Sequence, residues 1–205
     1  MLFDFAGVFT QSPFHAVRAW GARCGVDPEI AMEVAFGVYD DDTQHPWQRA
    51  ERGELALEDA VALVSVECAP LGLTVDPAGL MAFFRASAVQ EDILSWARRL
   101  HGAGYRAGIL TNSIAELGPS WRSLVPLDEL FDVVVESCDV GMRKPDPQVY
   151  ALALERLGVS AARTIFIDDW PGHVAAAKRL GMTGIVMGDD RSAALDELDA
   201  LIHLG

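Results

Sequence analysis

Lysine is almost absent from this chain of 205 residues: Lys144 and Lys178 are the only two among 16 basic residues, and the rest are arginines. The basic residues are also outnumbered by 30 acidic ones, which gives a formal net charge of −14. A charge of this sign repels nucleic-acid backbones and anionic membrane surfaces. Because the basic side chains are scattered and form no patch, we expect neither nucleic acid nor a membrane as a partner.

Cysteine and long apolar runs are scarce as well. Cys24, Cys68 and Cys138 are widely spaced and form no Cys-x-x-Cys pair, so the sequence predicts neither a disulfide framework nor a zinc site. No segment approaches the ~20 apolar residues of a membrane span, and the N-terminus lacks the pattern of a signal peptide. These absences predict a soluble, cytoplasmic protein, and the 51% hydrophobic content is ample for a buried core.

Four apolar runs predict short buried strands. They span residues 106–110, 132–135, 164–167 and 184–187. The runs are continuous, as in parallel strands that are covered on both faces, and helical patterns such as the one from Ile93 to Leu100 lie between them. This alternation predicts a doubly wound, Rossmann-like α/β fold, whose ligand lies at the carboxyl ends of the strands.

Polar residues follow the predicted strands. They are Asp4 after the apolar start of the chain, then Thr111 and Asn112, Glu136 and Ser137, and Asp168 and Asp169. Asp4 is flanked by apolar residues, which predicts a partly buried carboxylate, and an unpaired buried charge is costly. Only three residues precede Asp4, so we expect either a very short first strand or a chain that begins upstream.

A long segment separates Asp4 from Thr111, although one βαβ step takes only ~30 residues. Residues 11–88 show helical periodicity, for example from Leu57 to Val64, and no convincing strand. We therefore predict an α/β core made of residues 1–10 and 89–205, with a helical cap domain, residues 11–88, inserted after the first strand. The polar, turn-rich middle of the inserted segment is expected to hang over the sheet edge as a lid.

Four motifs resemble those of the haloacid dehalogenase superfamily, in the branch with a helical (C1) cap. FDFAGVFT is similar to the first motif, LTNS to the second, MRKPDPQVY to the third and FIDDWPGHVAAAKRLGM to the fourth. The stretches HPWQRAERGEL and RKPDPQVYALALERLGV are similar to the phosphatase-like domains found beside some epoxide hydrolases. The resemblance covers almost the whole chain and implies a hydrolase.

The resemblance implies, more narrowly, a Mg²⁺-dependent phosphatase acting on a small phosphorylated metabolite. Asp4 would be the nucleophile and form an aspartyl phosphate. Thr111 would hold the phosphoryl oxygens, Lys144 would neutralise charge, and Asn112 is a further candidate for binding substrate. The scarcity of lysine supports Lys144, because a chain that prefers arginine keeps a lysine where a compact ammonium is needed. Lys178 is expected on the surface.

The metal site follows from the same resemblance. Mg²⁺ prefers oxygen ligands in octahedral geometry. Asp4, Asp169 and the backbone carbonyl of Ala6 would supply three of them, and Asp168 would either ligate directly or support the ligands.

Ala6 departs from the family pattern. Most phosphatases of this superfamily carry a second aspartate there, which protonates the leaving oxygen, and such general acid–base help is worth typically ~10²–10⁴-fold. Its absence favours activated substrates such as acyl, anomeric or aryl phosphates. Alternatively, His15, His45 or His173 supplies the proton.

Other functions compete with this interpretation. Haloacid dehalogenases also lack the second aspartate and need no metal, but three neighbouring carboxylates favour a cation. Phosphonoacetaldehyde hydrolases resemble the alanine motif but use a cap lysine, and residues 11–88 contain none. A catalytically impaired relative that binds a phosphorylated ligand or a protein stays open, and so does the choice between a monomer and a homodimer.

Overall fold

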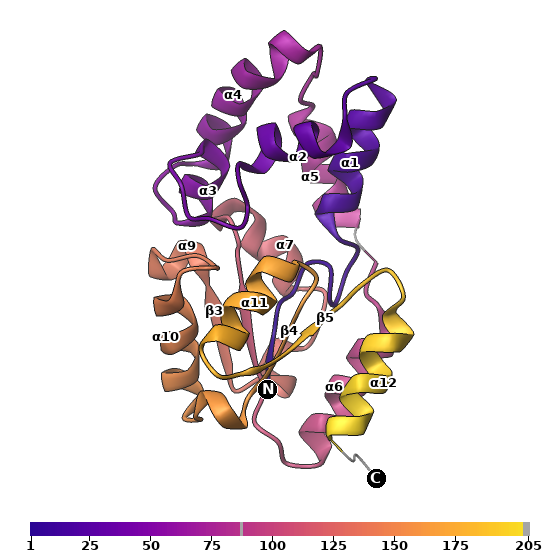
Figure 1. Ribbon diagram of the computed structural model, residues 1–205, viewed down its shortest axis with the longest axis vertical. Coiled ribbons are helices and arrows are strands. Elements are labelled where there is room, and N and C mark those ends of the chain that lie inside the picture. Colours follow the sequence, from indigo (N-terminus) through magenta and orange to yellow (C-terminus); the bar gives the residue numbers. More distant parts are fainter. Residues whose placement is uncertain (87, 203–205) are drawn as a thin grey trace.

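The computed structural model describes residues 1–86 and 88–202. Its core is a five-stranded parallel sheet with the strand order β3-β2-β1-β4-β5, and a helical cap lies over the carboxyl ends of the strands (Figure 1). The predicted doubly wound α/β fold with an inserted helical cap is therefore confirmed. The strands are β1 Leu2–Phe3, β2 Gly108–Thr111, β3 Val133–Glu136, β4 Ile165–Asp168 and β5 Thr183–Val186. All four of the predicted later strands are present, shifted by at most two residues.

Helices surround the sheet and form the cap. The cap contains α1 Pro13–Arg23, α2 Pro28–Phe36, α3 Pro46–Glu51, α4 Leu57–Cys68, the 3-10 turn Ala69–Leu71 and α5 Pro77–Ala86. The core contains α6 Glu91–Gly102, the 3-10 turn Ala115–Leu117, α7 Gly118–Arg122, α8 Leu127–Leu130, α9 Ser137–Val140, α10 Pro147–Leu157, the 3-10 turn Ala161–Arg163, α11 Pro171–Arg179 and α12 Arg191–Leu201. None of the helices in the described part of the chain has the length and apolarity needed to cross a membrane.

The shortest strand, β1, lies at the centre of the sheet. Phe3 pairs with Ile109 on β2 and with Ile167 on β4. The backbone N–H of Asp4 then donates to the carbonyl of Ile167 at 2.8 Å, which continues the ladder by one bond. Two neighbouring strands thus hold Asp4 at the carboxyl edge of the sheet, although β1 itself has only two residues.

The two faces of the sheet are covered by different helices, because successive side chains of a strand point to opposite faces. Phe3 packs in one apolar cluster with residues of α6 and α12, whereas Leu2 packs in another with residues of α10 and α11. The buried face of α6 runs from Ile93 to Leu100, as its periodicity predicts. Because helices cover both faces of the sheet, the strand sequences are continuous apolar runs and do not alternate with polar residues.

The inserted segment is helical, and no strand occurs among its described residues. Leu57, Ala60, Val61 and Val64 form the buried face of α4, as their spacing predicts. The chain leaves and re-enters the core at neighbouring points, where the N–H of Gln90 donates to the carbonyl of Phe9 at 2.8 Å. The division at residues 10/11 and 88/89 stays a prediction, and residues 87 and 203–205 of the predicted segments lie outside the described residues.

Candidate active site

Lys144 lies between two carboxylates at the carboxyl edge of the sheet. Its Nζ atom is 3.0 Å from Oδ1 of Asp4 and 2.6 Å from Oδ2 of Asp168, and its side chain is fully buried. The N–H of Phe5 also donates to Oδ1 of Asp4 at 2.7 Å. A buried ammonium with two anionic partners is strongly oriented, so the carboxylate of Asp4 is fixed by charge as well as by its strand.

Asp168 organises the neighbouring groups. Its Oδ1 accepts from the N–H of Trp170 at 2.7 Å, and its Oδ2 accepts from Lys144 and from Nδ1 of His173 at 3.2 Å. Both carboxylate oxygens therefore already have protein partners. This geometry suits a group that orients Lys144 and His173 more than one that ligates a metal directly.

Asp169 completes a cluster of three carboxylates. One oxygen from each of Asp4, Asp168 and Asp169 lies within 4.8 Å of the others. Oδ2 of Asp169 is buried and has no hydrogen-bond partner within the described residues. The side chain of Asp169 packs directly on Gly7, which has a φ of +80° and whose missing side chain makes room for the carboxylate. An unpartnered buried oxygen beside two further carboxylates is the donor set that a hard divalent cation needs.

The pKa values of these groups follow from burial and from their mutual charges. Burial raises the pKa of Asp4 to about 6 despite the opposing effect of Lys144. Burial also raises the pKa of Asp169 well above its usual value, and the charges of Asp168 and Asp4 raise it further. Burial opposes the ionisation of Asp168, but Lys144 and His173 outweigh it and hold the pKa of Asp168 low. The single positive charge of Lys144 does not balance the negative charges of three carboxylates. A bound cation would supply the missing positive charge.

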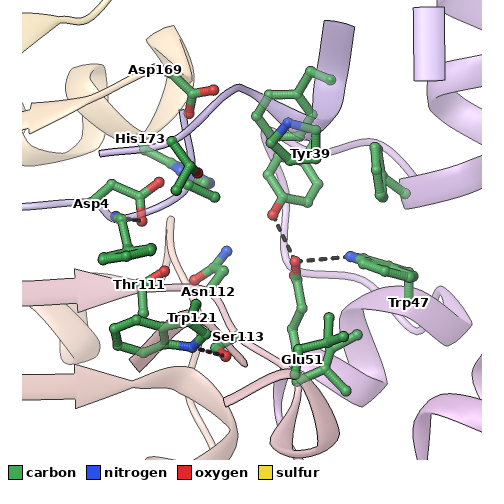
Figure 2. Close-up of a pocket in the computed structure, with 18 of the residues that line it drawn as sticks. Asp4, Tyr39, Trp47, Glu51, Thr111, Asn112, Ser113, Trp121, Asp169 and His173 are labelled. Atoms are coloured by element: carbon green, nitrogen blue, oxygen red, sulfur yellow. Dashed lines mark hydrogen bonds between the residues drawn. The ribbon is translucent and has the colours of Figure 1, made fainter. Parts of the chain in front are cut away.

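The second motif borders the same pocket. A cavity of about 80 Å³ is lined by Asp4, Ala6, Thr111, Asn112 and Asp169 on the core side (Figure 2). The side chain of Asn112 makes two hydrogen bonds with the backbone of Lys144: its Nδ2 donates to the carbonyl at 3.1 Å, and its Oδ1 accepts from the N–H at 2.8 Å. The sequence predicts that Asn112 binds substrate, and this role stays a prediction. In the structure the side chain of Asn112 holds the backbone of Lys144 in position.

A family model described as haloacid dehalogenase-like hydrolase matches residues 1–181. The chain belongs to this family of hydrolases. The parallel sheet with its inserted cap and the four motifs at one edge agree with that membership.

Two curated relatives match most or all of this hydrolase. Acyl-CoA dehydrogenase family member 10 from Mus musculus is 31% identical over 214 residues, which cover 100% of this chain but 20% of the mouse protein. Sesquiterpene phosphatase astK from Aspergillus oryzae is 28% identical over 200 residues, which cover 95% of this chain and 92% of the fungal one. The hydrolase therefore spans about a fifth of the mouse relative and nearly all of the fungal one.

A solved structure with the same fold is that of the haloacid dehalogenase family enzyme BT-2542 from Bacteroides thetaiotaomicron, in complex with magnesium and inorganic phosphate. It superposes with a TM-score of 0.61 at 18% identity and covers 90% of this chain and 91% of its own. At this identity the likeness shows the fold alone.

The cap closes the opposite side of the pocket of this hydrolase with two aromatic side chains and a carboxylate. Tyr39 and Trp47 face the carboxylates across the cavity, and both donate to Oε1 of Glu51, at 2.7 and 3.0 Å (Figure 2). Glu51 is 3% exposed, and its Oε2 accepts from Nε of Arg143 at 2.7 Å. This network joins the cap to the residue immediately before Lys144.

The turn-rich segment of the cap lies across the sheet edge of the hydrolase, as predicted. Asp40 accepts from Nε1 of Trp170 at 2.6 Å, and the carbonyl of Asp41 accepts from Nη1 of Arg143 at 2.9 Å. Asp40 also packs against Gly172, where a side chain would collide with it. The lid is therefore closed on the core in this structure.

Of the three histidines that were candidates for a proton donor, one lies at the site. His15 pairs with Asp189 on the surface, and His45 caps α3 through the N–H of Trp47. His173 lines the pocket beside Asp4, its Nε2 atom is buried without a partner among the residues described, and burial lowers its pKa.

Proposed function

We propose that this hydrolase is a Mg²⁺-dependent phosphatase that acts on a small phosphorylated molecule through an aspartyl phosphate on Asp4. The observation that carries the proposal is the cluster of Asp4, Asp168 and Asp169 at the carboxyl edge of the sheet, in which Asp4 and Asp168 pair with the buried Lys144. The fungal relative astK is named a sesquiterpene phosphatase, and BT-2542 was solved with magnesium and phosphate. The first name supports phosphatase activity in this chain, and the second structure supports a site for magnesium and phosphate on this fold. As the sequence predicts, we expect a cytoplasmic monomer or homodimer.

The donor set fits a divalent cation. Asp4 and Asp169, with the backbone carbonyl of Ala6, would hold Mg²⁺, and Asp168 would support the site through Lys144 and His173. When bound, Mg²⁺ would neutralise charge on the nucleophile and on the phosphoryl group.

The reaction then takes two displacements. A carboxylate oxygen of Asp4 attacks phosphorus, and the bond to the leaving group breaks with its electron pair on the leaving oxygen. Water next attacks the phosphorus of the aspartyl phosphate, and the bond between phosphorus and the carboxylate oxygen of Asp4 breaks with its electron pair on that oxygen. The water proton passes to solvent, inorganic phosphate leaves, and the carboxylate of Asp4 is free again. Lys144 would balance charge on Asp4 and on the phosphoryl oxygens in both steps, while Thr111 and nearby backbone N–H groups would hold those oxygens.

Ala6 sets a limit on the leaving group. A methyl side chain lines the pocket at the position where the motif usually supplies an acid, so it cannot protonate the leaving oxygen. General acid catalysis contributes typically ~10²–10⁴-fold, and its loss matters least for leaving groups that are already weak bases. We therefore propose acyl or aryl phosphates as the substrates of highest turnover.

The test measures phosphate release from acetyl phosphate and p-nitrophenyl phosphate, with and without Mg²⁺, for the native protein and for Asp4→Asn. We expect turnover that requires Mg²⁺ and is lost in Asp4→Asn, because the amide is a poor nucleophile of nearly the same shape. Metal-independent turnover would reject the Mg²⁺ assignment. Release of halide from a 2-haloacid without metal would instead indicate a dehalogenase.

A second candidate function is binding without catalysis, which Ala6 favours because it removes the acid from the pocket. Such a protein would bind inorganic phosphate or a phosphorylated ligand in the same place. Calorimetric binding of inorganic phosphate, together with no turnover above Asp4→Asn on either substrate, would establish this function instead.

A further inference from the structure

A second opening lies at the hinge between the cap and the core. This hinge cleft has a volume of about 720 Å³, against about 80 Å³ for the pocket beside Asp4. Most of its walls come from α1, from the segment that precedes α1, and from the loops that follow β4 and β5. Ser12 and Gly188 are among the lining residues, whereas Glu51 and Arg143 are not. The ion pair that joins the cap to the core therefore lies outside the cleft.

Asp169 borders both spaces. Together with Thr10 and Phe14, it lines the hinge cleft as well as the pocket beside Asp4. Within the carboxylate cluster, Asp4 is 7% exposed and Asp168 is 0% exposed, whereas Asp169 is only half-buried. Asp169 is thus the member of the cluster that can be reached from the wide cleft.

The charges along the hinge cleft do not oppose a cation. Each basic side chain of its described lining has an acidic partner, at 2.9, 2.7 and 2.8 Å respectively: His15 with Asp189, Arg18 with Glu29, and Arg191 with Asp92. Oδ2 of Asp169, in contrast, is buried without a hydrogen-bond partner among the described residues. The net charge of −14 also attracts cations to the chain as a whole.

The hinge cleft is open although the cap is closed. The contacts that hold the cap down include the pair of Glu51 with Arg143 and a bond from the N–H of Leu57, at the start of α4, to Oε1 of Glu116 at 3.0 Å. None of these four residues lines the cleft. With both contacts in place, the cleft still borders Asp169, so a small ion does not have to wait for the cap to open.

We infer that the divalent cation reaches Asp169, and leaves it, through the hinge cleft while the cap stays closed. The inference rests on the proposed metal site and adds the path to that site. Mg²⁺ held by few carboxylates keeps several of its water molecules, and the cleft has room for an ion with its water shell. The cation and the phosphorylated molecule then use different sides of the protein. A competing cation such as Ca²⁺ could replace Mg²⁺ while a phosphorylated molecule is held under the cap.

The experiment follows the binding of Mn²⁺, so its result does not depend on turnover. Mn²⁺ takes the same carboxylate and carbonyl ligands as Mg²⁺, and it quenches the fluorescence of nearby tryptophans. Trp170 follows Asp169 directly and lines the hinge cleft, so it supplies the signal. Stopped-flow fluorescence gives the rate constant of binding, and mixing the complex with EDTA gives the rate constant of dissociation. Asp169→Asn identifies the part of the signal that belongs to this site.

Gly188→Phe narrows the cleft. A Cβ atom at Gly188 meets no atom within 4 Å, so the added ring enters open space. We expect both rate constants to fall by the same factor, at least about tenfold, which is a barrier increase of about 1.4 kcal/mol, and the Kd for Mn²⁺ to stay the same. Gly102→Phe is the matched control, because Gly102 is equally open but does not line the cleft, and it should keep native rates.

A second blocking variant guards against misfolding of the first. Gln11 is exposed and lines the cleft, so Gln11→Phe serves the same purpose if Gly188→Phe fails to fold. Native rates in the folded blocking variants would overturn the inference.

Glu116→Ala tests the competing route beneath the cap. The substitution removes the bond to Leu57 and so favours opening of the cap, and Glu116 lines neither the cleft nor the pocket beside Asp4. Entry through the hinge predicts native Mn²⁺ rates in this variant, whereas faster binding and dissociation would show entry beneath the cap. Equal Mn²⁺ signals in the native protein and in Asp169→Asn would reject the proposed metal site together with its path. A specific signal that the blocking variants do not slow would reject the path alone.

Discussion

Arg143 and Glu51 form a buried ion pair across the boundary between the core and the cap, with Nε donating to Oε2 at 2.7 Å. The two residues are 92 positions apart in the chain. The guanidinium of Arg143 also lies over the ring of Tyr39, 4.7 Å from its centroid. Because Lys144 follows Arg143 directly, the position of the cap is coupled to the backbone that carries this lysine.

Removing one charge of this pair is expected to destabilise the protein. Glu51→Gln keeps the size of the side chain but leaves the buried charge of Arg143 with Asp42, at 3.8 Å, as its remaining carboxylate partner, and losing the closer partner is expected to cost up to roughly 3–5 kcal/mol. Urea unfolding measures the loss. The control is Glu29→Gln, which breaks the exposed pair with Arg18 in the same cap, also at 2.7 Å, and is expected to cost less than about 1 kcal/mol.

The double variant Glu51→Gln with Arg143→Met tests whether the pair accounts for this loss. Without either charge the desolvation penalty disappears, so the double variant is expected to be more stable than Glu51→Gln alone. Additive losses would show instead that the two residues act independently.

The two lysines allow a matched comparison. Lys144→Arg keeps the charge but forces a larger, planar group into a fully buried site between Asp4 and Asp168, and we expect turnover to fall about 10²–10³-fold. Lys178→Arg, on the exposed side of α11, is expected to leave turnover unchanged. Steady-state kinetics with acetyl phosphate measures the turnover of both variants. Equal turnover of Lys144→Arg and Lys178→Arg would show that Lys144 has no part in the mechanism.

Gly7 is expected to be required for the metal site. Gly7→Ala puts a methyl group into the space of the Asp169 carboxylate, so we expect Mg²⁺ affinity to fall about 10–100-fold, as for other changes that displace a ligand. Gly25→Ala introduces the same backbone strain, because Gly25 has a φ of +74°, but its added methyl group would meet no atom within 4 Å. Calorimetric titration with Mg²⁺ should therefore separate the two variants, and a native affinity in Gly7→Ala would contradict the assignment of Asp169.

Restoring the missing acid should widen the substrate range. Ala6→Asp is expected to raise turnover of simple alkyl phosphates by about 10²–10⁴-fold and to change turnover of acetyl phosphate little, because only the former need a protonated leaving group. Ala6→Asn, similar in size but without an acid, is the control. If both variants behave alike, the residue at position 6 acts through packing and not through proton transfer.

The sequence predicts the fold of this protein and the location of its motifs because the signals are local. Continuous apolar runs form the strands, and a polar residue directly after each one reaches the same edge of the parallel sheet. Asp4, Thr111 and Asp169 meet at that edge for this reason, whereas Lys144 reaches Asp4 from the segment between α9 and α10. Their roles in catalysis stay predictions until the variants are measured.

The cap side of the pocket is not predictable in the same way. Glu51 and Glu54 both lie in the stretch ERGEL, yet Glu51 is buried and Glu54 is exposed, because only Glu51 meets Arg143. Asn112 shows the same limit, since its partner is the backbone of Lys144, 32 positions away. Pairings over such distances depend on how the cap sits on the core, and no local pattern of residues encodes that.

The hydrogen bond between Gln90 and Phe9 shows that the cap is attached at one narrow point, far along the chain from the ion pair that holds its other side. We expect the cap to swing about this point as a unit, which would separate Glu51 from Arg143 and Asp40 from Trp170 in the same event. We expect this motion of the cap to limit the rate of product release. Turnover would then slow with solvent viscosity for the bulkier p-nitrophenyl phosphate, while acetyl phosphate, which needs less opening, would be much less sensitive.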